Sequence, residues 1–138
     1  LPRRLSRGFA RRMARLTVAD AGALIAYLDP GDAHHADAVQ GLIDVDQFLV
    51  HPVTLAEVLV HPARHCTESA VLNTLISIGM RESQMRVDAV ALARLRAESG
   101  LKMPDCLVLA TAIWHGTDVL TFDAQLKSVA NAQSGEAL

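Results

Sequence analysis

Four acidic side chains stand at or near the expected starts of helices, where they could do chemistry together. They are Asp20, Glu57, Asp105 and Asp123. Each has an ordinary explanation, because a helix start favours a carboxylate that accepts backbone N–H groups or faces the positive end of the helix dipole. Asp20 and Asp123 fit N-caps, and Thr54 with Glu57 matches the S/T-x-x-E capping box. Taken one at a time, each acid is best interpreted as a helix cap.

The four acids together admit a second interpretation. Parallel strands end at the same edge of a sheet, and this edge is where open α/β sheets bind ligands. Two carboxylates about 4 Å apart repel each other by about 4 kcal/mol at an effective dielectric constant near 20, so a cluster of four requires cations. Oxygen ligands suit Mg²⁺ or Mn²⁺ better than Zn²⁺, and paired ions stabilise the attacking and leaving oxygens of a phosphoryl displacement. The spacing therefore suggests, without compelling, a metal-dependent phosphodiesterase.

Short apolar segments alternate with helical ones around these acids. Strands are expected over residues 16–18, 48–50, 84–87 and 119–121. Helices are expected over residues 21–28, 33–43, 54–60, 67–78, 89–98 and 104–114, with a break at Pro62 and a short last helix opened by Asp123. The small, polar tail from Asn131 leaves room for a short edge strand. This alternation predicts a three-layer α/β/α sandwich around a central, mostly parallel sheet of four to five strands.

Size and composition are those of one globular domain. The chain has 138 residues, of which 51% are hydrophobic and 4% aromatic, so we expect a core of Ala, Val, Leu and Ile. No apolar stretch approaches the roughly 18 residues that a membrane span requires, and no membrane partner is expected. Cys66 and Cys106 lack a CxxC spacing and do not indicate a disulfide framework. A reducing cytoplasm is the expected location.

The positive charge is concentrated at the N-terminus. Six of the 13 basic residues, all arginines, precede Leu16, whereas all 15 acidic residues follow it. Residues 16–138 therefore carry a net charge of −8, and we expect residues 1–15 to be a basic extension to a domain over residues 16–138. Such an arm could bind nucleic acid. The alternative is a disordered extension, an expression remnant or a mis-assigned start. The sequence favours this alternative, because the domain pattern begins only at Leu16.

Four motifs, in this order, resemble those of the PIN-domain ribonucleases, and most of all the VapC toxins of bacterial toxin–antitoxin pairs. They are Val18-Ala-Asp20-Ala-Gly-Ala-Leu-Ile-Ala, Thr54-Leu-Ala-Glu57-Val, Pro104-Asp105-Cys-Leu-Val-Leu-Ala and Leu120-Thr121-Phe-Asp123. The resemblance covers residues 16 to about 129. It implies the α/β/α fold, a Mg²⁺-dependent endoribonuclease that acts as a toxin, a homodimer, and a small antitoxin partner that occludes the acidic site.

The resemblance also implies a role for each site residue. Asp20, Glu57, Asp105 and Asp123 match the acidic quartet of the family. Thr121 matches its Ser or Thr two residues before the last acid, where a hydroxyl could orient a ligand or a phosphate. We expect Asp20 and Asp105 to be the main ligands of Mg²⁺ (or Mn²⁺), with Glu57 and Asp123 completing the shell directly or through water. A metal-activated water would attack the phosphorus of the RNA substrate.

A few further residues have two interpretations each. His34 and His35 could contact RNA or be ordinary helix residues, and Lys102 could contact a phosphate or be a solvated surface lysine. Cys106 is better interpreted as a buried structural thiol than as a site residue. Asp118 opens a strand and should therefore lie at the opposite edge of the sheet from the acids.

Other functional classes fit the sequence less well. Aspartyl-phosphate phosphatases use a second aspartate two residues after the first, and that position here is Gly22. Receiver-type domains need an acidic pair at the first strand, but Asp20 is preceded by Ala19, and no lysine fits well after the last strand. A catalytically silent PIN-like scaffold that binds a protein partner or RNA stays open, although the complete set of four acids argues against it.

Overall fold

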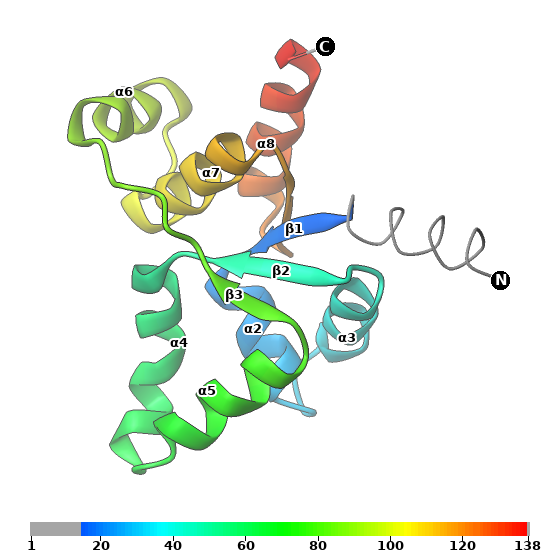
Figure 1. Ribbon diagram of the computed structural model, residues 1–138. Coiled ribbons are helices and arrows are strands. Elements are labelled where there is room, and N and C mark those ends of the chain that lie inside the picture. The colour runs from blue at the N-terminus through cyan, green and yellow to red at the C-terminus, as the bar shows by residue number, and fades with distance from the viewer. Residues whose placement is uncertain (1–14, 138) are drawn as a thin grey trace, which may run out of the picture.

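The computed structural model describes residues 15–137, with side chains to residue 133. Apart from Arg15, the expected N-terminal extension lies outside the described residues. The strands are β1 (Leu16–Ala19), β2 (Gln47–Val50), β3 (Met80–Glu82) and β4 (Asp118–Leu120). They form one sheet in the order β3-β2-β1-β4, in which every neighbouring pair is parallel (Figure 1). The carboxyl ends of all four strands therefore meet at one edge.

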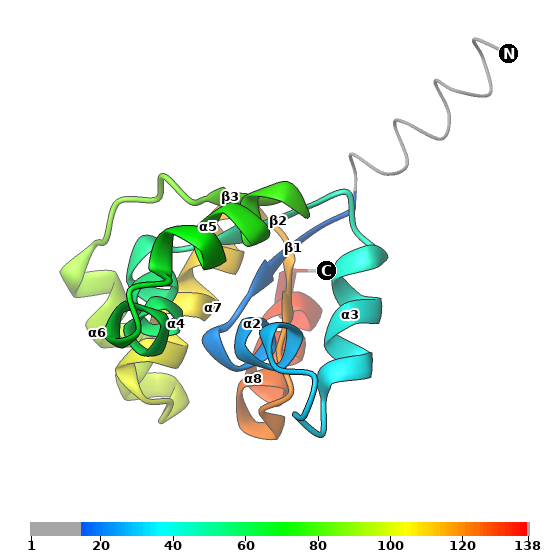
Figure 2. The ribbon, with the colours of Figure 1, turned by 90° about the horizontal axis from the view of Figure 1, so that it is seen from below.

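Helices cover both faces of this sheet. They are α2 (Ala21–Leu28), α3 (His35–Ile43), α4 (Pro52–Arg64), α5 (Glu68–Ser77), α6 (Ala89–Ser99), α7 (Met103–His115) and α8 (Ala124–Ala137). Helices α2 to α5 pack on one face, where α2 and α3 lie side by side, and α7 and α8 pack on the other (Figure 2). Helix α6 packs against α7. The predicted three-layer α/β/α sandwich is confirmed.

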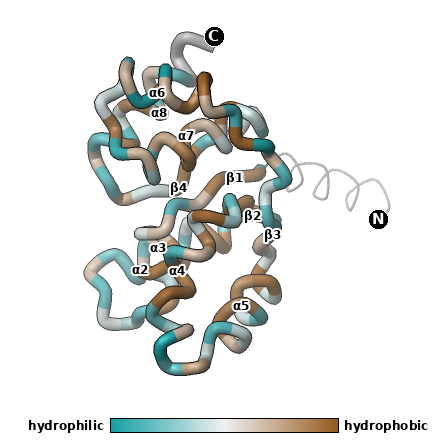
Figure 3. The backbone as a smooth tube through the Cα atoms, turned by 90° about the vertical axis from the view of Figure 1, so that its left-hand side faces the viewer, coloured by the Kyte–Doolittle hydropathy of each residue, from teal (hydrophilic) through white to brown (hydrophobic). Residues whose placement is uncertain are grey.

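The two cores arise from alternation along the central strands. Successive side chains of a strand point to opposite faces, so Phe48 and Val50 enter one core while Leu49 enters the other. In the same way Ala19 and Val18 face opposite layers. Strands β1 and β2 are thus buried on both sides, as is usual in parallel sheets, and they appear as apolar stretches in Figure 3.

The third strand lies earlier than its predicted position over residues 84–87, and that prediction is wrong. Gly79 turns the chain sharply after α5, with a φ of 110° that favours glycine, and a Cβ there would lie 2.9 Å from the Asp46 carbonyl oxygen. The strand therefore begins at Met80, and its pairing to β2 ends where the Ser83 N–H donates to the Val50 carbonyl (2.8 Å). Pairing with a distant strand, rather than local apolar alternation, decided its place.

Two helix boundaries also differ from the predictions. Helix α4 continues through Pro62 to Arg64, because a proline in the last turn removes one N–H without ending the preceding turns. Helix α8 has 14 residues and runs to Ala137, so it is not short, and residues 131–137 form no edge strand. Within residues 15–137, no helix combines the length and apolar character needed to cross a membrane.

Candidate active site

Asp20 is held rigidly at the carboxyl end of β1. Its Oδ1 accepts the N–H of Ala23 at 2.8 Å and its Oδ2 accepts the Thr121 hydroxyl at 2.5 Å. The side chain is only 7% exposed. Asp20 is thus the N-cap of α2, as ordinary capping predicts, and at the same time a carboxylate fixed from two sides.

Thr121 links Asp20 to the segment that carries Asp123. Its Oγ1 donates to Asp20 and accepts the N–H of Asp123 at 3.0 Å. Asp123 in turn caps α8, because its Oδ1 accepts the Leu126 N–H at 2.8 Å. The ends of β1 and β4, which are neighbours in the sheet, are therefore joined by side chains as well as by backbone pairing.

Three of the four acids surround one small cavity at this edge. Asp20, Glu57 and Asp105 line a space of about 60 Å³, together with Thr54 and neighbouring residues. This volume has room for an ion or a few waters, whose share of liquid volume is about 30 Å³ each, but not for a nucleotide. Asp123 does not line the cavity, and it lies to one side at a distance where its charge acts on Asp20 and Asp105.

The surroundings of Asp20 and Asp105 disfavour the charged form of both side chains. Burial raises the pKa of Asp20, and the Asp123 charge raises it further, against the lowering effect of the hydrogen bonds from Thr121 and Ala23. Burial also raises the pKa of Asp105, as do the charges of Asp123 and Asp20, while Lys102 lowers it. Raised carboxyl pKa values at a shared cavity are typical of sites that use the charge.

The donor chemistry fits a hard divalent cation, although the side chains are not gathered around one point. The ligands are carboxylate oxygens, the kind that Mg²⁺ prefers, and a cation would relieve their repulsion. Among the described residues, no group of three or more His, Cys, Asp or Glu side chains is close enough to hold a metal ion as positioned. Glu57 is exposed on α4, so its side chain can rotate toward Asp20.

Helix α4 begins earlier than predicted, which changes the interpretation of Glu57. The N-cap is His51, whose Nδ1 accepts the Val53 N–H at 3.1 Å, and Pro52 is the first helical residue. Thr54 is therefore inside the helix, and the predicted capping box is wrong. The sequence contained a signal for this earlier start, because proline is favoured at the first helical position and Pro52 occupies it. Glu57 thus lacks the ordinary explanation that its spacing suggested.

Asp105 lacks a capping role too. Helix α7 starts after Lys102, which makes no side-chain capping bond, and Asp105 lies in the first turn. The neighbouring Cys106 is buried, and its thiol donates to the Leu101 carbonyl at 3.5 Å, so it is a structural thiol as expected. Asp118 is exposed at the start of β4, at the opposite edge from the acids, again as expected.

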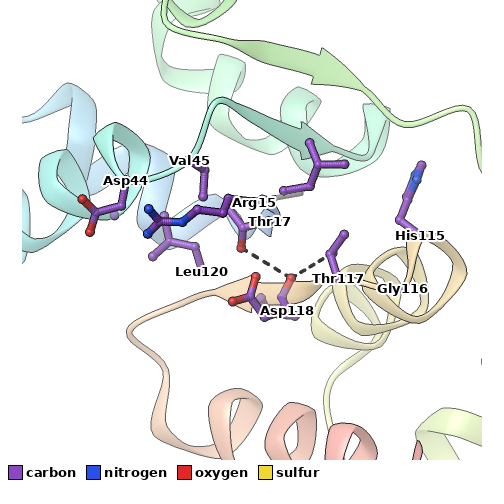
Figure 4. A pocket seen from close by; sticks show the side chains of 12 residues that line it. Arg15, Thr17, Asp44, Val45, His115, Gly116, Thr117, Asp118 and Leu120 are labelled. Atoms are coloured by element: carbon purple, nitrogen blue, oxygen red, sulfur yellow. Dashed lines mark hydrogen bonds between the residues drawn. The ribbon is translucent and has the colours of Figure 1, made fainter. Parts of the chain in front are cut away.

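A hollow larger than the acidic cavity lies at that opposite edge. It has a volume of about 700 Å³ and is lined by the starts of β1 and β4, including Arg15, Thr17 and Asp118. Figure 4 shows the Thr17 and Thr117 hydroxyls donating to the Asp118 carbonyl. The bond from Thr17 ties β1 to β4, whereas the bond from Thr117 is local. None of the four candidate acids lines this hollow. Chemistry, and not size, therefore selects the small acidic cavity as the site.

Comparison with known protein families shows which family the chain belongs to. The model of the PIN domain matches residues 17–132 of the chain. The chain belongs to the PIN-domain family. The resemblance expected from the four motifs is confirmed, since the matched range includes all of them. No curated protein matches the chain in sequence.

Three solved structures have a fold similar to that of this chain over most of their length. The chain is 30% identical to a protein in a toxin–antitoxin complex from Klebsiella pneumoniae, over 78% of this chain and 86% of that one, with a TM-score of 0.61. VapC20 of Mycobacterium tuberculosis, a sarcin–ricin loop cleaving toxin, is 17% identical. The match covers 82% of this chain and 94% of VapC20, with a TM-score of 0.63. PAE2754 of Pyrobaculum aerophilum is 22% identical. The match covers 83% of this chain and 84% of PAE2754, with a TM-score of 0.57.

Replacing Thr121 by Val should destabilise this PIN domain by about 1–3 kcal/mol, the usual cost of leaving a buried polar group unpaired. The methyl group of Val can neither donate to Asp20 nor accept from Asp123. Urea unfolding followed by circular dichroism measures the loss. Thr121→Ser, which keeps the hydroxyl, is the control and should lose less than half as much. Equal losses in the two variants would show that the methyl contacts matter as much as the hydrogen bonds.

Replacing Asp105 by Asn should stabilise the PIN domain at pH 7. Because the folded pKa of Asp105 lies above its ordinary value of 3.8, the folded state takes up a proton before the unfolded state as the pH falls, and stability rises. The neutral Asn removes this dependence. We therefore expect the melting-temperature advantage of the variant to shrink from pH 7 toward pH 4. A constant or growing difference would contradict the raised pKa.

Proposed function

We propose that this PIN domain is a metal-dependent endoribonuclease and the toxin of a toxin–antitoxin pair. The observation that carries the proposal is the convergence of Asp20, Glu57 and Asp105 on one small cavity at the carboxyl edge of the sheet. Glu57 neither caps α4 nor lies in its first turn, so local stability does not explain its position. Asp105 makes no capping bond, although the dipole of α7 favours an acid in its first turn. Two solved structures with this fold, one a sarcin–ricin loop cleaving toxin and one a toxin–antitoxin complex, support the same activity.

Within this proposal Asp20 and Asp105 are the main ligands of Mg²⁺ (or Mn²⁺), and Glu57 and Asp123 complete the shell. When bound, the ion supplies a nucleophilic water at neutral pH and offsets charge on the scissile phosphate. The protein supplies orientation. Thr121 and the Ala23 N–H hold both oxygens of Asp20 in place, while the raised pKa values of Asp20 and Asp105 mean that a cation is favoured over bare carboxylates.

The partners in this proposal are RNA, a small antitoxin and a second copy of the chain. An antitoxin that covered the cavity would block access, because the cavity is too small for RNA to enter and the substrate must bind over it. Exposed apolar side chains on α7, among them Ile113 and Trp114 at 51% and 61% exposure, supply apolar surface for a homodimer.

The proposal is tested by incubating a mixed RNA pool with the purified chain in Mg²⁺, and in EDTA with and without Mg²⁺ added back. We expect defined cleavage products with Mg²⁺, none with EDTA, and recovery on adding excess Mg²⁺. Cleavage that persists in EDTA would exclude a metal-dependent site. If the chain bound RNA or a protein partner but cut nothing after the partner was stripped off, it would be a catalytically silent scaffold.

A further inference from the structure

An aromatic stack includes Phe122, which lies between Thr121 and Asp123 in the chain. The rings of His34 and Phe122 are parallel within 3°, and their centroids are 4.6 Å apart. His34 stands just before α3, whereas Phe122 lies in the loop after β4, between Thr121 and Asp123. The stack therefore joins two segments that are distant in sequence, and one of these segments carries two of the proposed site residues.

The His34 ring is held by the stack alone. His34 is exposed, and no hydrogen bond of its ring nitrogens occurs within the described part of the chain. Its backbone is fixed, because its N–H donates to Asp32 Oδ1 at 2.8 Å and its carbonyl accepts from Ala38 at 2.9 Å. The adjacent His35 differs, since its Nδ1 lies 2.8 Å from the Ala26 carbonyl. His34 thus has one ring face on Phe122 and the other toward solvent.

The stack is tied closely to the site. Phe122 is bonded directly to Thr121 and Asp123, and consecutive Cα atoms lie about 3.8 Å apart. Thr121 in turn donates its hydroxyl to Asp20. A nucleic-acid strand with a phosphate at the acids would therefore carry a neighbouring base past the outer face of His34.

We propose that the outer face of His34, backed by Phe122, is the stacking site for one base of single-stranded RNA next to the cleaved phosphate. This inference rests on the proposed function and extends it to the substrate's conformation, because a base can stack there only if it is unpaired. Aromatic rings, including that of histidine, are the usual platforms for unpaired bases. Residues 16–138 carry a net charge of −8, so attraction to phosphates is weak and an uncharged contact has more to contribute.

The test uses single-stranded RNA decamers of mixed sequence with one 2-aminopurine, a base whose fluorescence falls when it stacks. We expect the wild-type chain to quench this fluorescence and His34→Ala to abolish the quenching, with binding about tenfold weaker. Tenfold corresponds to about 1.4 kcal/mol. His34→Tyr keeps a flat ring and should stay within about twofold of wild type. His65→Ala is the matched control, because His65 is an exposed histidine paired with His61 on α4.

The outcomes separate this inference from the proposed function. RNA cleavage by the wild type, run in parallel, tests the nuclease proposal. Cleavage together with unchanged quenching in His34→Ala would overturn the stacking site and leave the nuclease standing. Quenching that depends on His34 without any cleavage would support the base site and refute the nuclease. If His34→Ala lost binding to a protein partner but kept its binding to RNA, the inference would also be overturned, since the stack would then bind protein.

Discussion

Asp20→Asn should lower the proposed Mg²⁺-dependent RNA cleavage by more than about 100-fold, because residues that merely orient metal ligands typically account for 10–100-fold and Asp20 is proposed as a ligand itself. The amide is nearly the same size as the carboxylate and can still accept the Ala23 N–H. It carries no charge for a cation, and its nitrogen faces the Thr121 hydroxyl. Initial rates of cleavage under single-turnover conditions measure the effect directly.

The same substitution should not lower the melting temperature. Burial raises the pKa of Asp20, which means that the charged carboxylate opposes folding at neutral pH, and the neutral amide removes that cost. Lost activity with retained stability would separate a functional residue from a structural one. Asp118→Asn is the matched control, since Asp118 is exposed at the other edge of the sheet, and it should cut as wild type does.

Two results would contradict this interpretation of Asp20. Cleavage that survives in Asp20→Asn would mean that the activity comes from another site or from a contaminant. A large fall in melting temperature would mean that the capping bond to α2 outweighs the electrostatic cost, and the loss of activity would then say little about chemistry. The neutral variant Asp105→Asn tests a second position at the same cavity.

Phe48→Ala should lower the free energy of unfolding by about 3–5 kcal/mol, the range found for truncating a buried aromatic side chain. Phe48 is fully buried in β2, and its ring fills the core between the sheet and α2 to α5. Strand β2 lies between β1 and β3, so the cavity would open in the middle of the layer, where the surroundings collapse least. Urea unfolding gives the value.

Domains of this size are stable by only about 5–15 kcal/mol, so Phe48→Ala should be close to unfolding at 37 °C. Ile43→Ala is the control. Ile43 is 68% exposed at the end of α3, and its truncation should change stability by no more than about 0.5 kcal/mol. If Phe48→Ala cost less than about 1 kcal/mol, this face of the sheet would not be packed as described.

The sequence alone was enough to predict much of the fold, because several boundaries depend on short-range signals. Asp88 caps α6 and Gly100 ends it, so the helix expected over residues 89–98 is found at Ala89–Ser99. Pro104 in the first turn and Gly116 at the end likewise place α7 close to the expected residues 104–114. Apolar strands alternating with helices indicated the parallel sheet, and a parallel sheet must bring its carboxyl ends to one edge. The approach of Asp20, Glu57 and Asp105 followed from that rule.

Tertiary structure decided what depends on partners far away in the chain. The position of β3 was set by its pairing with β2 and by the turn at Gly79, neither of which local alternation can reveal. Asp123 stands beside the cavity rather than in it, because the way α8 leaves β4 depends on packing. The stack of His34 on Phe122 joins two loops whose approach requires the whole fold. Sequence thus determined which residues reach the edge, and long-range packing determined how they face one another.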